Sequence, residues 1–168
     1  IGINKYSRDP LCVAKQDAEA MNDFFRTSLN VSPSHAFLLT DAQATRQAIL
    51  RTFNTVRKQA GPEDSVLVFI AGHGVVDEDK TSYFMPVDGN WNELYSTAIR
   101  MSDFDYLLQR RASRILVIAD ACYSSSIIKM RGKKNVFERL AGKGRQVIGY
   151  QSPAEENSRL GHGYMTYY

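Results

Sequence analysis

The chain has 168 residues, enough for one domain with a hydrophobic core. Its 43% hydrophobic and 23% charged residues are ordinary for a soluble globular protein, and its net charge of +3 is too small to indicate nucleic-acid binding. No apolar run approaches the ~18 residues of a membrane span, and no signal peptide is evident. Residues 1–4 resemble the end of a strand already under way, so we interpret the chain as a piece of a longer protein with flanking regulatory domains.

Strand and helix patterns alternate along the sequence. The predicted strands are short apolar runs, over residues 1–4, 35–39, 66–70, 115–119 and 146–150. The predicted helices have apolar residues at helical spacing, over residues 15–29, about 43–59 and about 103–111. This alternation predicts an α/β fold with a mainly parallel sheet and helices on both faces.

Polar and turn-forming residues mark the boundaries of these elements. Thr40 and Asp41 are predicted to cap the second helix, and Ser102 or Asp103 the third. Residues 75–87 resemble a small hairpin whose polar tip is residues 77–80.

Two apolar runs break into small residues beside a reactive side chain. Residues 65–74 (SVLVFIAGHG) contain His73, and residues 113–124 (SRILVIADACYS) contain Cys122. Parallel strands lying side by side would bring both residues to one edge of the sheet, where open α/β folds bind their ligands. A thiol needs a base to become a thiolate near neutral pH, so this pair predicts a cysteine nucleophile with a histidine partner. We expect Gly72 and Gly74 to let the backbone turn sharply and leave its N–H groups uncovered.

The other histidines and cysteine carry less signal. Cys12 is interpreted as a small structural residue of the core. His162 repeats the Gly-His-Gly tripeptide but follows a polar segment, so we assign it a structural role, and His35 only opens a predicted strand. Two cysteines make no disulfide framework, which favours a reducing, cytoplasmic setting.

Six sequence blocks in order resemble the caspase-like peptidases (peptidase C14), in particular the bacterial and metacaspase-type branch. The blocks are residues 1–6 (IGINKY), 16–21 (QDAEAM), 69–74 (FIAGHG), 83–88 (YFMPVD), 120–124 (DACYS) and 161–166 (GHGYMT). The 49-residue spacing from His73 to Cys122 agrees with that family. The resemblance implies a single caspase–hemoglobinase domain over residues 1–168 that hydrolyses peptide bonds through an acyl-enzyme.

The resemblance also implies roles for individual residues. Cys122 matches the nucleophile and His73 the general base, while the backbone N–H groups of Gly74 and Cys122 match the oxyanion hole. No third side chain is evident for orienting His73, so we expect a dyad. Calcium activation is implied by the resemblance alone; the residues themselves predict no metal or other cofactor.

Charge in the expected pocket predicts the specificity. Asp17 and Asp120 stand where metacaspases place pocket acids, which would favour a protein or peptide substrate with Arg or Lys before the cut. The alternative interpretations are an exposed acid in the first turn of a helix for Asp17 and a residue that holds the loop by hydrogen bonds for Asp120. Ala71 is expected to line the same pocket, and Ser152 a wall of the cleft that pairs with extended substrate.

The stretch 129–145 has seven basic residues and one acid. We interpret it as a solvated linker between two parts of the domain that resemble the large and small subunits of a caspase-like zymogen. An enzyme that cuts after basic residues could process itself there. We expect no nucleic-acid or membrane partner. An inactive caspase-like scaffold is the main alternative function; a nucleotide-binding fold is disfavoured because no glycine fingerprint follows the first strand.

Overall fold

The computed structural model describes residues 1–108, 114–123 and 145–150. These residues form a five-stranded sheet of order β3-β2-β1-β4-β5. The strands are β1 (Ser65–Val76), β2 (Ser82–Phe84), β3 (Ile99–Arg100), β4 (Arg114–Tyr123) and β5 (Arg145–Tyr150). Strands β1, β4 and β5 are parallel, and β2 and β3 add an antiparallel edge. The predicted α/β fold with a mainly parallel sheet is therefore confirmed.

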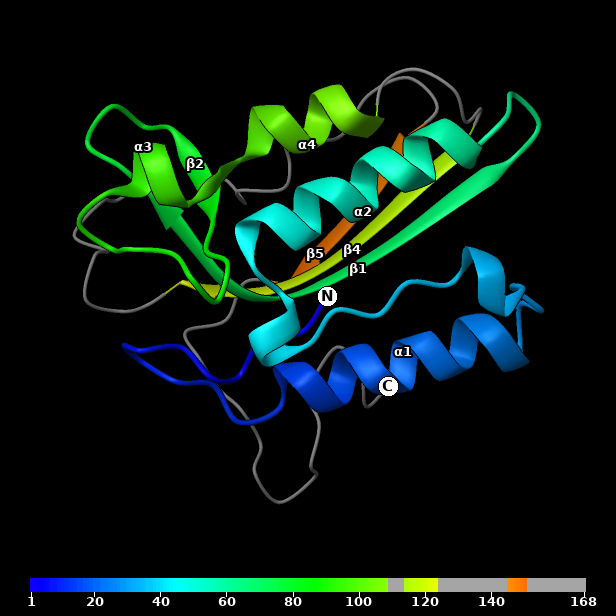
Figure 1. Cartoon of the computed structure of the whole chain (residues 1–168), viewed down its shortest axis with the longest axis horizontal. Helices are drawn as coiled ribbons and strands as arrows, with labels where there is room; N and C mark the ends of the chain where they lie inside the picture. Colours follow the sequence, from blue (N-terminus) through cyan, green and yellow to red (C-terminus); the bar gives the residue numbers. More distant parts are fainter. Residues whose placement is uncertain (109–113, 124–144, 151–168) are drawn as a thin grey trace.

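Helices cover both faces of this sheet. They are α1 (Ala14–Thr27), α2 (Arg46–Gln59), the short α3 (Leu94–Thr97) and α4 (Met101–Leu108). Figure 1 shows α2 and α4 on one face of the sheet and α1 on the other. None of the helices in the described ranges is long and apolar enough to cross a bilayer.

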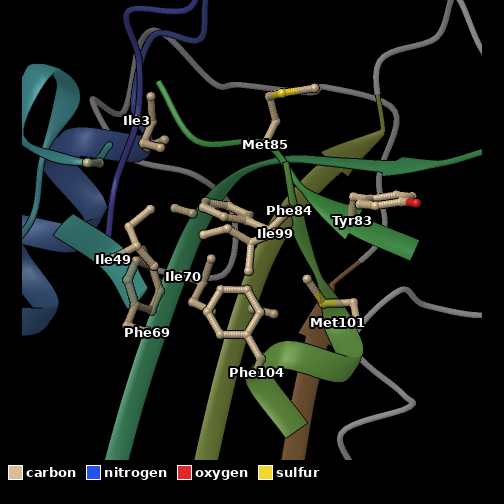
Figure 2. Packing of buried hydrophobic residues seen from close by; sticks show 14 of the residues in the cluster. Ile3, Ile49, Phe69, Ile70, Tyr83, Phe84, Met85, Ile99, Met101 and Phe104 are labelled. Carbon is tan, nitrogen blue, oxygen red and sulfur yellow. The ribbon is translucent and has the colours of Figure 1, made fainter. Parts of the chain in front are cut away.

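One part of the core lies between the sheet and the α2–α4 layer, and buried residues of α1 such as Ala14 and Ala18 extend it on the other face. The Phe104 ring packs edge-on against Phe53 at 4.8 Å between centroids and lies 6.2 Å from Phe84. Figure 2 shows Ile70 of β1 among these side chains. Burial of such apolar residues from both strands and helices is the main stabilising contribution, at roughly 25 cal/mol per Å² of buried apolar surface.

The N-terminal segment continues the sheet beside β1. Gly2 forms parallel bridges with Thr40 on one side and with Ala71 on the other. A Cβ at Gly2 would lie 2.2 Å from the Ala14 carbonyl oxygen and 2.5 Å from the Ala18 side chain, so only glycine lets α1 pack this closely. The strand predicted over residues 1–4 is not formed as such: the structure has isolated bridges at Gly2, with backbone hydrogen bonds from Gly2 and Ile3 beside them, and Gly2 is the point of closest packing.

Two predictions for residues 35–46 were wrong. Residues 35–39 form no strand, because Pro33 begins a 3-10 turn (Pro33–His35) and the following residues meet the sheet only near Gly2. Helix α2 begins at Arg46 rather than near residue 43, and Thr45 caps it by accepting a hydrogen bond from the Ala48 N–H at 3.2 Å. A separate 3-10 turn (Asp41–Gln43) precedes it.

The remaining boundaries agree closely with the sequence patterns. The hairpin is confirmed, with Val75 opposite Tyr83 and a turn between the two strands. Helix α4 begins at Met101, so Ser102 and Asp103 lie in its first turn rather than at its cap. The predicted strands 66–70, 115–119 and 146–150 correspond to β1, β4 and β5, of which β1 and β4 extend further at their carboxyl ends.

Candidate active site

The pairing of β1 with β4 brings the two chemically reactive positions side by side. Ten consecutive residues pair in parallel, from Ser65 with Arg114 to Gly74 with Tyr123, and His73 pairs with Cys122. Neighbouring strands lie about 4.8 Å apart, so the two backbone positions are direct neighbours near the carboxyl ends of both strands. Both positions lie inside strands, not in the turns after them as the sequence suggested.

The surroundings of the His73 imidazole, which is only 2% exposed, include a backbone carbonyl and two aromatic rings. Its Nε2 lies 2.6 Å from the carbonyl oxygen of Asp9. The Tyr6 ring packs on one side at 4.5 Å between centroids, and the Trp91 ring approaches edge-on at 5.4 Å. A carbonyl oxygen can only accept, so Nε2 carries the hydrogen in this bond, and the neutral ring then has its lone pair on Nδ1.

The Asp9 carbonyl takes the orienting position for which the sequence showed no side chain. Asp9 has a φ of 51°, in the left-handed region that asparagine and aspartate tolerate best among residues with a side chain. Such a backbone conformation costs free energy and persists where its surroundings fix it. The strained residue of this loop is therefore the one that holds the imidazole.

Tyr6 supports His73 through the backbone as well as through its ring. Its hydroxyl accepts a hydrogen bond from the His73 N–H at 3.1 Å and donates one to the Met85 carbonyl at 3.0 Å. The Met85 N–H donates in turn to the His73 carbonyl at 2.9 Å. The Tyr6 hydroxyl thus bridges the His73 N–H and the Met85 carbonyl, which would otherwise be positioned for a direct backbone hydrogen bond.

Gly72 leaves the space that this hydroxyl needs. A Cβ at position 72 would lie 2.5 Å from the Tyr6 hydroxyl oxygen and 3.0 Å from the Phe84 ring. The strand continues straight through Gly72 and Gly74, so the expected sharp turn is absent. The physical reason for glycine at position 72 is close approach of two side chains.

The loop that carries Tyr6 and Asp9 is fixed at both ends. At its start, the Asp41 carboxylate accepts hydrogen bonds from the N–H groups of Asn4 (2.8 Å) and Lys5 (3.0 Å). Asp41 therefore anchors this loop, not the helix that it was predicted to cap. At its end, the Asn4 side chain bonds the Cys12 carbonyl and the Lys15 N–H, each at 2.9 Å.

Two of the predicted pocket residues, Ala71 and Asp120, occupy one row of the sheet. Ala71 pairs with Gly2 on one side and with Asp120 on the other, and Asp120 pairs with Tyr150. This row lies two residues before the His73–Cys122 row, about 6.6 Å along the strands. Ala71 is buried at 1% exposure, and Asp120 is partly exposed.

Asp17 belongs to the buried side of α1. It is 1% exposed and lies beside Ala14 and Ala18, the residues that pack on Gly2. The turns of α1 that carry Asp17 therefore pack on Gly2, which pairs with Ala71 in that row.

The other candidates are placed differently or lie elsewhere. Cys12 is exposed, so its interpretation as a core residue was wrong; it lies in the loop before α1. His35 is also exposed, at the end of a 3-10 turn. Ser152, His162 and residues 129–144 of the basic segment lie outside the described residues. Within the described ranges, no three His, Cys, Asp or Glu side chains are grouped as metal ligands.

Comparison with known proteins decides the family. The sequence model of the caspase domain, peptidase C14, matches residues 1–163. The chain belongs to the caspase-domain family.

The curated relatives of this caspase domain are fungal metacaspases. Metacaspase-1 of Coccidioides immitis is 27% identical over 151 residues, covering 77% of this chain and 31% of the relative. Metacaspase-1 of Botryotinia fuckeliana is 26% identical over 151 residues, with 77% and 34% covered. The chain therefore spans about a third of the length of these relatives.

A solved structure has the same fold. Protein GSU0716 of Geobacter sulfurreducens superposes with a TM-score of 0.56 at 20% sequence identity, covering 72% of this chain and 48% of that chain. The caspase-like fold expected from the sequence is therefore confirmed.

Proposed function

We propose that this caspase domain is a cysteine endopeptidase in which Cys122 is the nucleophile and His73 the general base. The observation that carries the proposal is the β1–β4 register, which pairs the two residues. In the reaction, the Cys122 thiol gives its proton to Nδ1 of His73, and the thiolate attacks the peptide carbonyl carbon. The imidazolium then protonates the leaving amine as the C–N bond breaks, and water hydrolyses the resulting thioester.

The surroundings of His73 suit both halves of this proton transfer. The Asp9 carbonyl, 2.6 Å from Nε2, keeps that nitrogen protonated and leaves Nδ1 to act as the base. Nε2 donates to this carbonyl both before and after Nδ1 takes up the proton, so the ring keeps its orientation through the transfer. We propose that the backbone N–H groups of Gly74 and Cys122 are the oxyanion donors. One such donor typically lowers the activation free energy by about 3–4 kcal/mol.

We further propose that the enzyme cuts after Arg or Lys. Asp120 lies in the row two residues before the reactive pair, and the buried Asp17 is carried on α1, which packs on Gly2 of that row. Two carboxylates in one pocket would favour a cationic side chain and oppose an acidic one. A guanidinium also supplies several N–H donors, which makes Arg the better match.

Self-processing within residues 129–145 follows from the same specificity, because this stretch offers seven basic residues. We propose that the cut separates the β4 part of the domain from the β5 part.

A panel of fluorogenic peptides ending in Arg, Lys or Asp tests the proposal, assayed with added calcium and with a chelator. We expect release from the Arg and Lys peptides, loss of at least about 10³-fold in Cys122→Ala, and no self-cleavage of that variant. Release from the Asp peptide alone would refute the charge argument. No release, together with no labelling of Cys122 by an arginyl chloromethylketone, would favour the scaffold alternative.

Matched carboxylate variants separate pocket charge from overall charge. We expect Asp120→Asn to lower kcat/KM for the Arg peptide about tenfold or more, because a charge-assisted partner is lost. Asp23→Asn removes the same charge from an exposed position of α1 and should leave kcat/KM unchanged. Equal activity of the two variants would exclude Asp120 from the pocket.

A further inference from the structure

Trp91 contacts His73 from the side of β1 that faces away from Cys122. Cys122 lies on β4, one neighbour of β1, whereas the chain leading to Trp91 leaves β2, the other neighbour. The indole edge reaches the imidazole at 5.4 Å between centroids, and the side chain is partly exposed. His73 is therefore flanked by the nucleophile's strand on one side and by an accessible aromatic surface on the other.

The segment that presents Trp91 is fixed at several points. The Val87 N–H donates to the Ala44 carbonyl, and the Asp88 carboxylate accepts from the Arg46 N–H at 2.8 Å, at the start of α2. The Asn90 N–H donates to the Thr97 hydroxyl at 2.8 Å. These bonds fix residues 87, 88 and 90, so the backbone that leads into Trp91 is held in place. The ring is therefore a preorganised surface.

The path of a substrate past His73 follows from the chemistry of the cut. The imidazole must reach the leaving nitrogen, so the residue that follows the cleaved bond passes the imidazole on the side away from the sulfur. Trp91 comes from the segment that follows β2, on the opposite flank of β1 from β4, and its ring packs against the imidazole. The strand order therefore favours Trp91 as a surface beside this path.

The chemistry of this surface favours an apolar side chain. The Arg8 guanidinium lies 5.5 Å from the indole centroid, and its charge is offset by Asp9, whose carboxylate is 3.5 Å from it. Trp91 thus presents a flat, largely apolar ring beside His73, and the cation over it is already paired with a carboxylate. We infer that Trp91 forms the subsite for the residue after the cut and favours a large apolar residue there, an inference that rests on the proposed peptidase activity.

Two quenched-fluorescence peptides that differ only after the cleaved Arg, with Leu in one and Gly in the other, test the inference. We expect wild-type kcat/KM to be about tenfold higher for Leu, because a partly exposed surface gives the lower end of what one apolar side chain contributes to discrimination. Trp91→Ala should reduce the ratio to about twofold or less, and Trp91→Phe should keep most of it. Tyr95→Ala is the matched control, since Tyr95 is 75% exposed and stacks on Arg100 instead.

The outcomes distinguish this inference from the proposed function. If wild type cuts neither peptide and an arginyl chloromethylketone leaves Cys122 unlabelled, the peptidase proposal fails and the subsite fails with it. If wild type cuts both peptides equally, or if Trp91→Ala keeps the tenfold ratio, the subsite alone is refuted. The chloromethylketone occupies only the side before the cut, so normal labelling of Trp91→Ala shows that its reactive pair is intact.

Discussion

The two edges of β1 are built in different ways. Along the β4 edge, ten residues pair in one unbroken parallel ladder. Along the other edge three partners follow one another: the N-terminal segment pairs near Ala71, the Tyr6 hydroxyl meets His73, and β2 pairs from Gly74 to Val76. The regular edge sets which residue stands beside His73, and the irregular edge sets how the imidazole is held.

The two edges should therefore differ in how well they tolerate substitutions. A ladder of backbone hydrogen bonds depends little on any one side chain, whereas the other edge depends on single atoms such as the Tyr6 hydroxyl and the Asp9 carbonyl. Small changes on the irregular edge should therefore affect catalysis while the sheet survives.

Gly72→Ala should have the largest effect of the three changes considered below. Its methyl group would lie 2.5 Å from the Tyr6 hydroxyl and 3.0 Å from the Phe84 ring, so Tyr6 must move away from His73. We expect the free energy of unfolding to fall by about 1–3 kcal/mol, as in other overpacked cores. We also expect kcat to fall roughly 100-fold, the scale of a 1 Å misplacement in an active site. Chemical unfolding and steady-state kinetics measure the two effects.

Gly61→Ala is the control for Gly72→Ala. The added Cβ meets only the Asp64 carboxylate at 3.4 Å, an ordinary contact, so stability should stay within about 0.5 kcal/mol. Wild-type activity in Gly72→Ala would show that Tyr6 does not position His73.

Tyr6→Phe should have an intermediate effect, because it keeps the ring beside the imidazole and removes only the bridging hydroxyl. The His73 N–H and the Met85 carbonyl both lose this partner in a buried place, which costs about 1–3 kcal/mol. We expect kcat to fall about tenfold with KM nearly unchanged, since the base and not the substrate pocket is disturbed.

Tyr83→Phe is the control for Tyr6→Phe, because it removes the hydroxyl of another buried tyrosine, one that bonds Asp77 rather than His73. It removes a 3.1 Å hydrogen bond from the hydroxyl to Asp77, in the turn between β1 and β2. A comparable loss of stability with unchanged kcat is expected. Equal kcat in the Tyr6 and Tyr83 variants would contradict a positioning role for Tyr6.

The regular edge is also the part that sequence patterns predicted well. Continuous apolar runs predicted β1, β4 and β5, and small residues at the ends of two runs indicated His73 and Cys122. These signals are local: each can be read within about ten consecutive residues.

The irregular edge was not predictable in the same way. The contacts of Tyr6 and Asp9 with His73 join residues 67 and 64 positions apart, and the contact of Asp41 with Asn4 spans 37. Asp41 looked like a helix cap because an Asp before a helical pattern is the usual cap. The orienting group of His73 is a backbone carbonyl, which no residue type reveals. Only the left-handed backbone at Asp9 marks it, and that appears in the structure alone.

The smallest expected effect concerns pH and the turn between β1 and β2. Burial raises the pKa of Tyr83 above its ordinary value of 10, and the hydrogen bond to the Asp77 carboxylate raises it further. The folded chain therefore keeps this proton to a higher pH than the unfolded chain does. Its contribution to stability is complete below pH 10 and decreases as the pH rises through the pKa of the folded state.

Tyr83→Phe removes this proton, so the stability gap between wild type and the variant should narrow as the pH is raised from 8 to beyond 10. Chemical unfolding at a series of alkaline pH values measures the gap. Tyr95→Phe, which changes a 75% exposed ring, should follow the wild-type curve throughout. A gap that stays constant to the highest accessible pH would mean that Asp77 and burial do not hold the phenol neutral. The turn would then owe its shape to the second contact of Asp77, which accepts the Thr81 N–H at 2.7 Å.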